Sequence, residues 1–113
     1  MPVPDYQSIM LPLLKALAGG KECHSRELID LLANTFQLTA EERRELLPSG
    51  TQFVFDNRIG WAKSYLKKAG LLSSEKRGVV QISSLGLEVL NRNPEKINVA
   101  FLKQFDSFRE FIG

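Results

Sequence analysis

Apolar residues recur at helical spacing along most of the chain, and polar capping residues divide the pattern into separate helices. The first helix is predicted from Asp5, as its cap, to about Ala18. Pro12 falls inside this helix and should kink it, unless the helix begins later with Pro12 in its first turn. Four more helices are expected. The second is capped by Ser25 and carries apolar residues to Phe36, and the third runs from a Thr39 capping box through Leu47. The fourth is capped by Asp56 or Asn57 and ends at Ala69, and the fifth runs from its cap Ser84 to about Arg92.

Short strands are predicted between these helices. Residues 21–24 suit a small edge strand, and residues 71–74 and 79–83 suit the two strands of a hairpin. The tip of the hairpin is Glu75-Lys76-Arg77-Gly78. The chain is thus expected to be mainly α with a small β-hairpin. A helix that runs directly into a hairpin with a charged tip is typical of a winged helix-turn-helix, here with an extra short helix and a C-terminal helix.

Residues 95–113 carry a second pattern, which separates them from the predicted winged-helix domain over residues 1–94. Their apolar residues form one stripe of an amphipathic helix: Phe101, Leu102, Phe105, Phe108, Phe111 and Ile112. We consider three roles for this helix: packing back onto the domain, forming a homodimer, or connecting to a further domain. An exposed stripe of this size would otherwise favour aggregation.

Composition excludes several classes of protein. The chain has 113 residues, 43% of them hydrophobic and 25% charged, which suits one globular domain rather than a disordered chain. Cys23 is the only cysteine and His24 the only histidine, so a structural zinc site is not expected, nor is any cofactor. The chain has no apolar run long enough to span a membrane and no basic N-terminal signal, and we expect it to be cytoplasmic.

Charge is distributed unevenly. Residues 51–80 carry six basic and two acidic side chains, an excess of four positive charges, whereas the other 83 residues carry a net charge of −2. A positive region of this kind favours an anionic partner, although an exposed lysine-rich helix and turn would give the same count.

The helix predicted over 56–69 has two different sides when residues are placed about 100° apart. Its apolar side consists of Ile59, Ala62, Leu66 and Ala69. The opposite side has no acidic residue and suits a helix that enters the major groove of DNA, with the hairpin on the backbone or in the minor groove. The candidate DNA-binding residues of the helix and the hairpin are Asn57, Arg58, Gly60, Lys63, Ser64, Lys67, Lys68, Lys76 and Arg77.

Three residues of this helix have alternative interpretations. Gly60 costs about 1 kcal/mol relative to alanine, so it indicates either a close approach to DNA or tight packing on a neighbouring helix. Arg58 lies near the apolar side, where it could bind a carboxylate or carbonyl instead of DNA. Trp61 is expected to lie mostly in the core.

No catalytic motif is found. No lysine has an acidic residue two positions before it, as a metal-dependent nuclease motif would require, and no phosphate-binding loop or nucleophile elbow is present. Cys23 and His24 are neighbours that would point apart in a strand. We therefore expect no enzymatic activity from these residues.

Several blocks in a fixed order resemble the N-terminal domain of Mrr-type restriction endonucleases over residues 3–94. The blocks are Val3-Pro4-Asp5-Tyr6, Leu47-Pro48-Ser49-Gly50, Asn57-Arg58-Ile59-Gly60-Trp61-Ala62, Leu66-Lys67-Lys68-Ala69-Gly70-Leu71 and Lys76-Arg77-Gly78-Val79. The resemblance implies a winged-helix module that targets a type IV restriction enzyme to double-stranded, modified DNA, with a recognition helix over 57–68 and a wing over 75–78. The nuclease domain of that family has no counterpart in this sequence. A stand-alone transcriptional regulator, or a winged helix that binds proteins, is the alternative.

Overall fold

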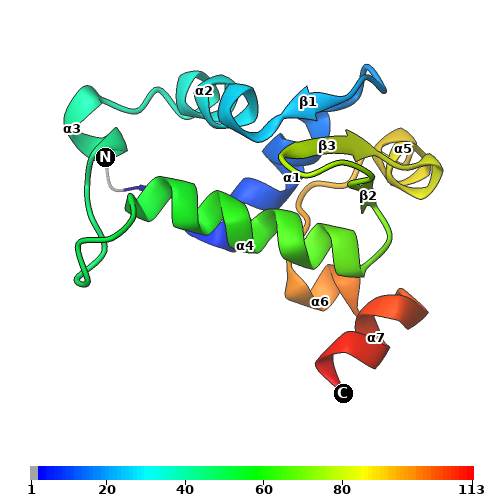
Figure 1. The fold of residues 1–113 in the computed structure, drawn as a ribbon. Coiled ribbons are helices and arrows are strands. Elements are labelled where there is room, and N and C mark those ends of the chain that lie inside the picture. The colour runs from blue at the N-terminus through cyan, green and yellow to red at the C-terminus, as the bar shows by residue number, and fades with distance from the viewer. Residues whose placement is uncertain (1–2) are drawn as a thin grey trace.

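The computed structural model describes residues 3–113, so the first two residues of the predicted domain lie outside it. The molecule is mainly helical with a small antiparallel sheet (Figure 1). In chain order, the elements are α1 (Tyr6–Ala16), β1 (Cys23–His24), α2 (Ser25–Thr35), α3 (Ala40–Arg43), α4 (Val54–Lys68), β2 (Leu72–Ser73), β3 (Val79–Ile82), α5 (Ser84–Asn91), α6 (Val99–Leu102) and α7 (Asp106–Ile112).

The sheet has three strands in the order β1-β3-β2, and both pairings are antiparallel. Cys23 of β1 lies opposite Val80, and Leu72 of β2 lies opposite Ile82. The predicted hairpin and edge strand are therefore confirmed, with slightly shorter strands. Because β3 lies in the middle, the hairpin is attached through β1 to the start of α2.

Helix α1 forms the centre of the core. Ile9, Met10, Leu13 and Leu14 have no exposed surface and pack between α2 and α4. The Asp5 cap is confirmed, since its carboxylate accepts a hydrogen bond from the Ser8 N–H at 2.8 Å. The helix continues through Pro12 instead of starting there, and it ends at Ala16, two residues earlier than predicted.

Three of the predicted caps are wrong, because α4 is preceded by Phe53 as its N-cap rather than by Asp56 or Asn57, and the caps of α2 and α5 also differ. Helix α2 begins at Ser25 itself, with His24 as a cap that makes no side-chain bond. Helix α5 is capped by Ser83, whose hydroxyl accepts from the Gly86 N–H at 3.0 Å, and not by Ser84. The Thr39 capping box is confirmed, but α3 ends at Arg43 because the chain then turns to form a bridge between Leu46 and Phe53.

Helix α4 begins at Val54, two residues before the predicted recognition helix over 56–69. The core supplies the reason, because Val54 and Phe55 are both buried in its first turn. The end matches the prediction closely. Gly70 has φ +84°, and the Leu71 N–H donates to the Leu66 carbonyl at 2.9 Å, which closes the helix in a left-handed turn.

Residues 95–113 form two short helices, α6 and α7, instead of the single helix predicted there. Leu102 and Phe108 are fully buried, and the Val99 N–H donates to Gln7 Oε1 of α1 at 2.8 Å. These contacts confirm the expectation that the segment packs back onto the domain. Phe111 and Ile112 remain nearly half exposed. The boundary at residue 94, the homodimer and the role as a connector to a further domain stay predictions.

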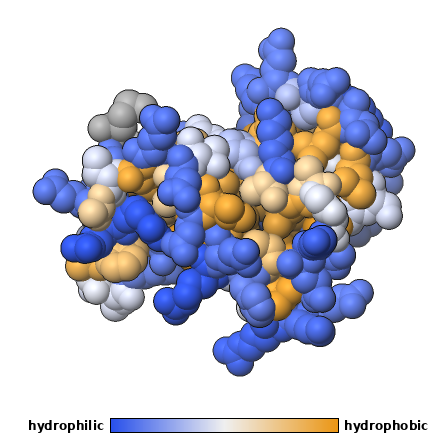
Figure 2. Space-filling view, turned by 90° about the horizontal axis from the view of Figure 1, so that it is seen from above, coloured by the Kyte–Doolittle hydropathy of each residue, from blue (hydrophilic) through white to orange (hydrophobic). Residues whose placement is uncertain are grey.

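The arrangement leaves one long side of α4 open. Figure 1 shows α2 and the sheet on one side of this helix, and α6 and α7 on the other side near its C-terminal end. Viewed from above α2 and β3, the surface is mostly hydrophilic, and hydrophobic residues show between the polar side chains (Figure 2).

Candidate nucleic-acid interface

The two sides of α4 are arranged as its sequence predicts. The predicted apolar residues Ile59, Ala62, Leu66 and Ala69 are at most 1% exposed. They pack mainly on α1, which contacts α4 more extensively than any other element does. The core therefore fixes the rotation of α4 about its axis, and the lysine-bearing side faces outward.

A cleft of about 290 Å³ follows that outward side, between α4 and the hairpin. Four candidate residues of α4 line it, and so do residues of the hairpin and of α2. Its lining residues are Ser25, Gly60, Lys63, Ser64, Lys67, Ser74, Gly78, Val79 and Val80. We call this the lysine cleft. The fold thus brings residues separated by about fifty positions in the sequence into one basic depression.

Lys63 connects the three elements that form the lysine cleft. Its ammonium donates to Ser25 Oγ at 3.0 Å, and the Ser25 N–H donates to the Gly78 carbonyl at 2.9 Å. Burial lowers the pKa of Lys63 below its ordinary value. A partly desolvated ammonium gains strongly from an anion, so Lys63 is suited to bind a phosphate oxygen.

Gly60 leaves open space at the floor of the lysine cleft. A Cβ atom built at this position would meet no atom within 4 Å. Tight packing against a neighbouring helix is thus excluded as the reason for this glycine. The other interpretation, close approach of a ligand to the helix backbone, stays a prediction.

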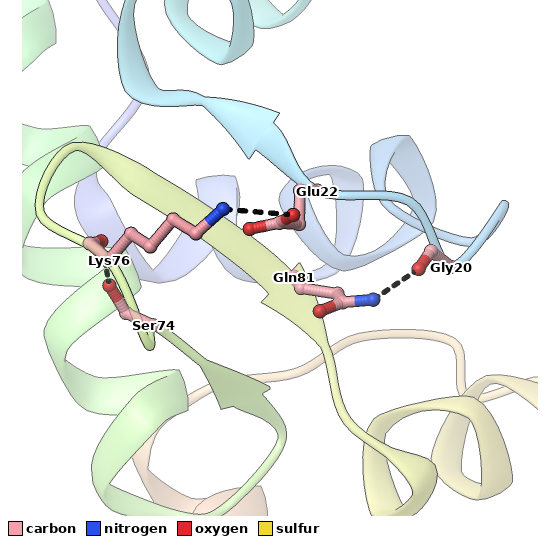
Figure 3. A network of polar contacts seen from close by, with 5 residues as sticks. All are labelled: Gly20, Glu22, Ser74, Lys76 and Gln81. Carbon is pink, nitrogen blue, oxygen red and sulfur yellow. Dashed lines mark hydrogen bonds and ion pairs between the residues drawn. The ribbon is translucent and has the colours of Figure 1, made fainter.

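The tip of the hairpin is held by its own hydrogen bonds. Ser74 Oγ lies 2.7 Å from the Val79 carbonyl and 3.2 Å from the Lys76 carbonyl, and Gly78 turns the chain at φ +77°. Lys76 lies 3.9 Å from Glu22, as Figure 3 shows, in an exposed ion pair that holds it only weakly. Arg77 is exposed beside it.

Gln81 connects the hairpin to the chain before β1. Its side-chain amide donates to the Gly20 carbonyl at 2.6 Å, a contact also visible in Figure 3. This bond and the β1-β3 pairing hold the hairpin in place beside α4.

Besides Lys76 and Arg77 at the hairpin tip, three candidate residues of α4 do not line the lysine cleft. Asn57 donates to Gln52 Oε1 at 3.2 Å, ahead of the cleft. The Arg58 guanidinium donates to the carbonyls of Val3 and Pro4 at 2.8 and 3.3 Å, in agreement with its structural interpretation. Lys68 lies over the ring of Phe111, 5.3 Å from its centre.

The expectation that Trp61 lies mostly in the core is wrong. Its side chain is 53% exposed. The ring meets Tyr65 edge-on, with 6.2 Å between the ring centres. Tyr65 fills the position that the tryptophan was expected to take, because its ring also contacts Tyr6 and Phe108.

A second groove of about 720 Å³ adjoins the lysine cleft and was not predicted. The two share Ser25 and Gly78. Its lining residues are His24, Ser25, Arg26, Ile29, Asp30, Ala40, Arg43, Arg44, Phe53, Asp56 and Gly78. We call it the arginine groove. Its arginines are flanked by acidic residues in the sequence, so charge counting along the chain gave no sign of it.

The charges of the arginine groove are partly neutralised. Arg43 forms an ion pair with Asp30 at 2.6 Å. Burial raises the pKa of Asp56, and the positive charges of Arg43 and Arg26 oppose this effect. The groove could therefore add a backbone contact through Arg26 or Arg44, but its net charge is lower than that of the lysine cleft.

The described residues offer no metal centre. Over residues 3–113, no three His, Cys, Asp or Glu side chains lie close enough to hold an ion. Cys23 is buried, which raises its pKa, while His24 is exposed on the other side of the strand. Within the same residues, none of the helices combines the length and apolar character needed to cross a membrane.

These features define a small helical domain in which a three-stranded sheet and one basic helix enclose a positively charged cleft. The family model of the Mrr N-terminal domain matches residues 6–92, and the chain belongs to this family.

One curated relative is the type IV methyl-directed restriction enzyme EcoKMrr of Escherichia coli strain K12. It is 33% identical over 96 residues, which cover 84% of this chain. The chain spans only 31% of the length of that relative. No solved structure matches the chain significantly. The domain is therefore part of a restriction-system family, and the relative contains much that this chain does not.

Proposed function

We propose that this chain is a winged-helix domain that binds double-stranded DNA. In this proposal, α4 is the recognition helix in the major groove, and the hairpin of β2 and β3 is the wing on the backbone or in the minor groove. The order of the elements supports this assignment, because α4 leads directly into the hairpin and β1 completes the sheet on the other side of β3.

The lysine cleft is the observation that carries the proposal. Lys63 and Lys67 extend into it from α4, and Lys76 and Arg77 stand at the hairpin tip beside it. Among these elements, the only acidic residues are Asp56, which lines the arginine groove, and Glu75 at the tip. Phosphates bound here would release counterions, which gives affinity with little dependence on base sequence.

We further propose that the domain targets a restriction activity to modified DNA. The name of the relative describes a methyl-directed enzyme, and the chain corresponds to less than a third of it. This supports a targeting role for the chain, with DNA cleavage assigned to a part of such enzymes that lies outside the matched region. The expected ligand is then a duplex that carries methylated bases.

Fluorescence anisotropy with a labelled duplex across a salt series tests the proposal. The triple variant Lys63→Glu, Lys67→Glu, Arg77→Glu should lose binding. The control is a second triple variant with the same change of charge, Lys15→Glu, Arg92→Glu, Lys96→Glu. These residues line neither the lysine cleft nor the arginine groove, so this variant should keep most of the DNA affinity.

The possible outcomes separate the functions considered. Tighter binding to methylated duplexes would support the restriction role, whereas a strong preference for one unmodified palindrome would favour a transcriptional regulator. Absence of binding at low salt, or equal losses in both triple variants, would refute DNA binding through this face. A protein partner would then be the better hypothesis.

A further inference from the structure

One row of side chains on α4 faces outward beside the lysine cleft. Asn57, Trp61, Ser64 and Lys68 follow one another at three- or four-residue intervals, so they lie along one line of the helix surface. Trp61, Ser64 and Lys68 are exposed, and Asn57 is partly exposed. This outer row contains no acidic residue.

Trp61 is the only large apolar side chain on the outward side of α4, and the fold does not account for it. More than half of its surface is exposed, and its ring contact is the edge of Tyr65. The aromatic cluster behind it is already complete, because Tyr65 packs on Tyr6, Phe108 and Phe111 without it. An exposed indole at this position suggests a ligand with an apolar group.

We propose that Trp61 contacts the C5 methyl groups of pyrimidines in the major groove, and so favours thymine and 5-methylcytosine over uracil and cytosine. This inference rests on the proposed function, since it requires α4 to lie in the major groove. The C5 methyl is the apolar group that a pyrimidine presents there, and apolar side chains are its usual contact.

Charge favours DNA over a protein as the occupant of this row. Lys68 belongs to the outer row, and Lys67 and Lys63 follow on its cleft side. A duplex places phosphates beside the groove floor, so lysines on the cleft side of an apolar group match its surface. A protein partner would need to be strongly acidic around an apolar centre.

The test compares duplexes of one sequence that differ only in methyl groups. The first contains thymine and cytosine, the second has uracil in place of every thymine, and the third has 5-methylcytosine in place of every cytosine. Anisotropy titrations of the 113-residue chain should show about fourfold weaker binding to the uracil duplex, if one methyl group is buried against the ring. The 5-methylcytosine duplex should bind at least about fourfold more tightly than the first duplex.

Variants of Trp61 assign the effect to this residue. Trp61→Gln should bind the three duplexes with nearly equal affinity, whereas Trp61→Leu keeps an apolar surface and should keep part of the difference. Lys67→Ala is the matched control from the same helix: it should weaken binding to all three duplexes and leave their ratios unchanged. Because Trp61 is exposed, these variants should unfold at temperatures close to that of the wild type.

The outcomes distinguish this inference from the proposed function. Salt-sensitive binding with equal affinities for the three duplexes would overturn the role of Trp61 and leave DNA binding intact. Ratios that persist in Trp61→Gln would overturn it as well, since they would come from the shape of the modified DNA. No binding to any duplex would refute the proposed function, and with it this inference.

Discussion

Replacing Lys63 with methionine should separate the stability of the domain from its affinity for DNA. Burial lowers the pKa of the Lys63 ammonium in the folded protein. The unfolded chain, with a lysine pKa of about 10.4, therefore binds this proton more tightly than the folded chain does. It follows that stability rises with pH between the lowered pKa and about 10.4, and that the charge destabilises the fold at lower pH.

The methionine variant keeps most of the apolar stem of Lys63 and loses the ammonium. It also loses the hydrogen bond to Ser25 Oγ, which has a length of 3.0 Å. Such a bond contributes about 1 kcal/mol, and relief from burying the charge opposes that loss. The free energy of unfolding at neutral pH should therefore stay within about 1 kcal/mol of the wild type. The rise in stability at alkaline pH should disappear.

Binding to DNA should lose part of its dependence on salt. One phosphate contact contributes about 0.9 to the slope of log K against log salt. The wild type should bind DNA more tightly than the variant at low salt. Between about 50 and 200 mM salt, the ratio of the two affinities should fall by about 3.5-fold. Urea unfolding at several pH values measures the change in stability, and anisotropy at several salt concentrations measures the change in DNA binding. Ser25→Ala is the control, because it removes the hydrogen-bond partner and keeps the charge.

Two results would contradict this reasoning. If Lys63→Met lowers the free energy of unfolding by more than about 2 kcal/mol, the ammonium stabilises the packing of the three elements. It would then not be a partly buried charge that is available to bind an anion. An unchanged salt slope would mean that no phosphate occupies the lysine cleft.

Four other predictions concern separate parts of the molecule. Gly60→Ala has room for its Cβ and should raise the free energy of unfolding by about 1 kcal/mol, while anisotropy shows weaker DNA binding if the backbone approaches the duplex closely. Arg58→Ala loses two hydrogen bonds to the N-terminal segment and should cost about 1–3 kcal/mol in urea unfolding, with an unchanged salt slope. Gly86→Ala would place its Cβ 2.3 Å from a backbone oxygen and should cost about 3 kcal/mol or more, seen as a lower melting temperature. If the chain forms the predicted homodimer, Phe111→Ser with Ile112→Ser should shift sedimentation from dimer to monomer, and a wild-type monomer at high concentration would refute that dimer.

The sequence predicts the order of the elements because that order depends on local patterns. The apolar side of α4, the Thr39 capping box and the turn at Gly70 are each encoded within a few residues, and each is confirmed. The errors come from tertiary contacts. Helix α4 starts at Val54 because the core buries its first turn, and the capping residue of α2 changes because the Ser25 N–H donates to the hairpin.

Competition between two side chains for one core position explains the wrong prediction for Trp61. Trp61 and Tyr65 lie four residues apart and both border the apolar side of α4, so the sequence cannot assign the buried position to one of them. The α7 segment decides in favour of Tyr65, because Phe108 and Phe111 pack on that ring. The arginine groove was missed for a similar reason, since only the fold brings Arg26 beside Arg43 and Arg44.

The two edges of the outward side of α4 differ in chemistry, and this difference bears on how a duplex could be recognised. The edge toward the hairpin has lysines over an open glycine, which suits phosphates and gives affinity without sequence preference. The edge toward α7 has an exposed indole, which can distinguish bases only by their apolar groups. Contacts to phosphates position a protein on DNA, and contacts to bases give it specificity. In the proposed function, these two edges would let the domain bind many sequences and still respond to methyl groups.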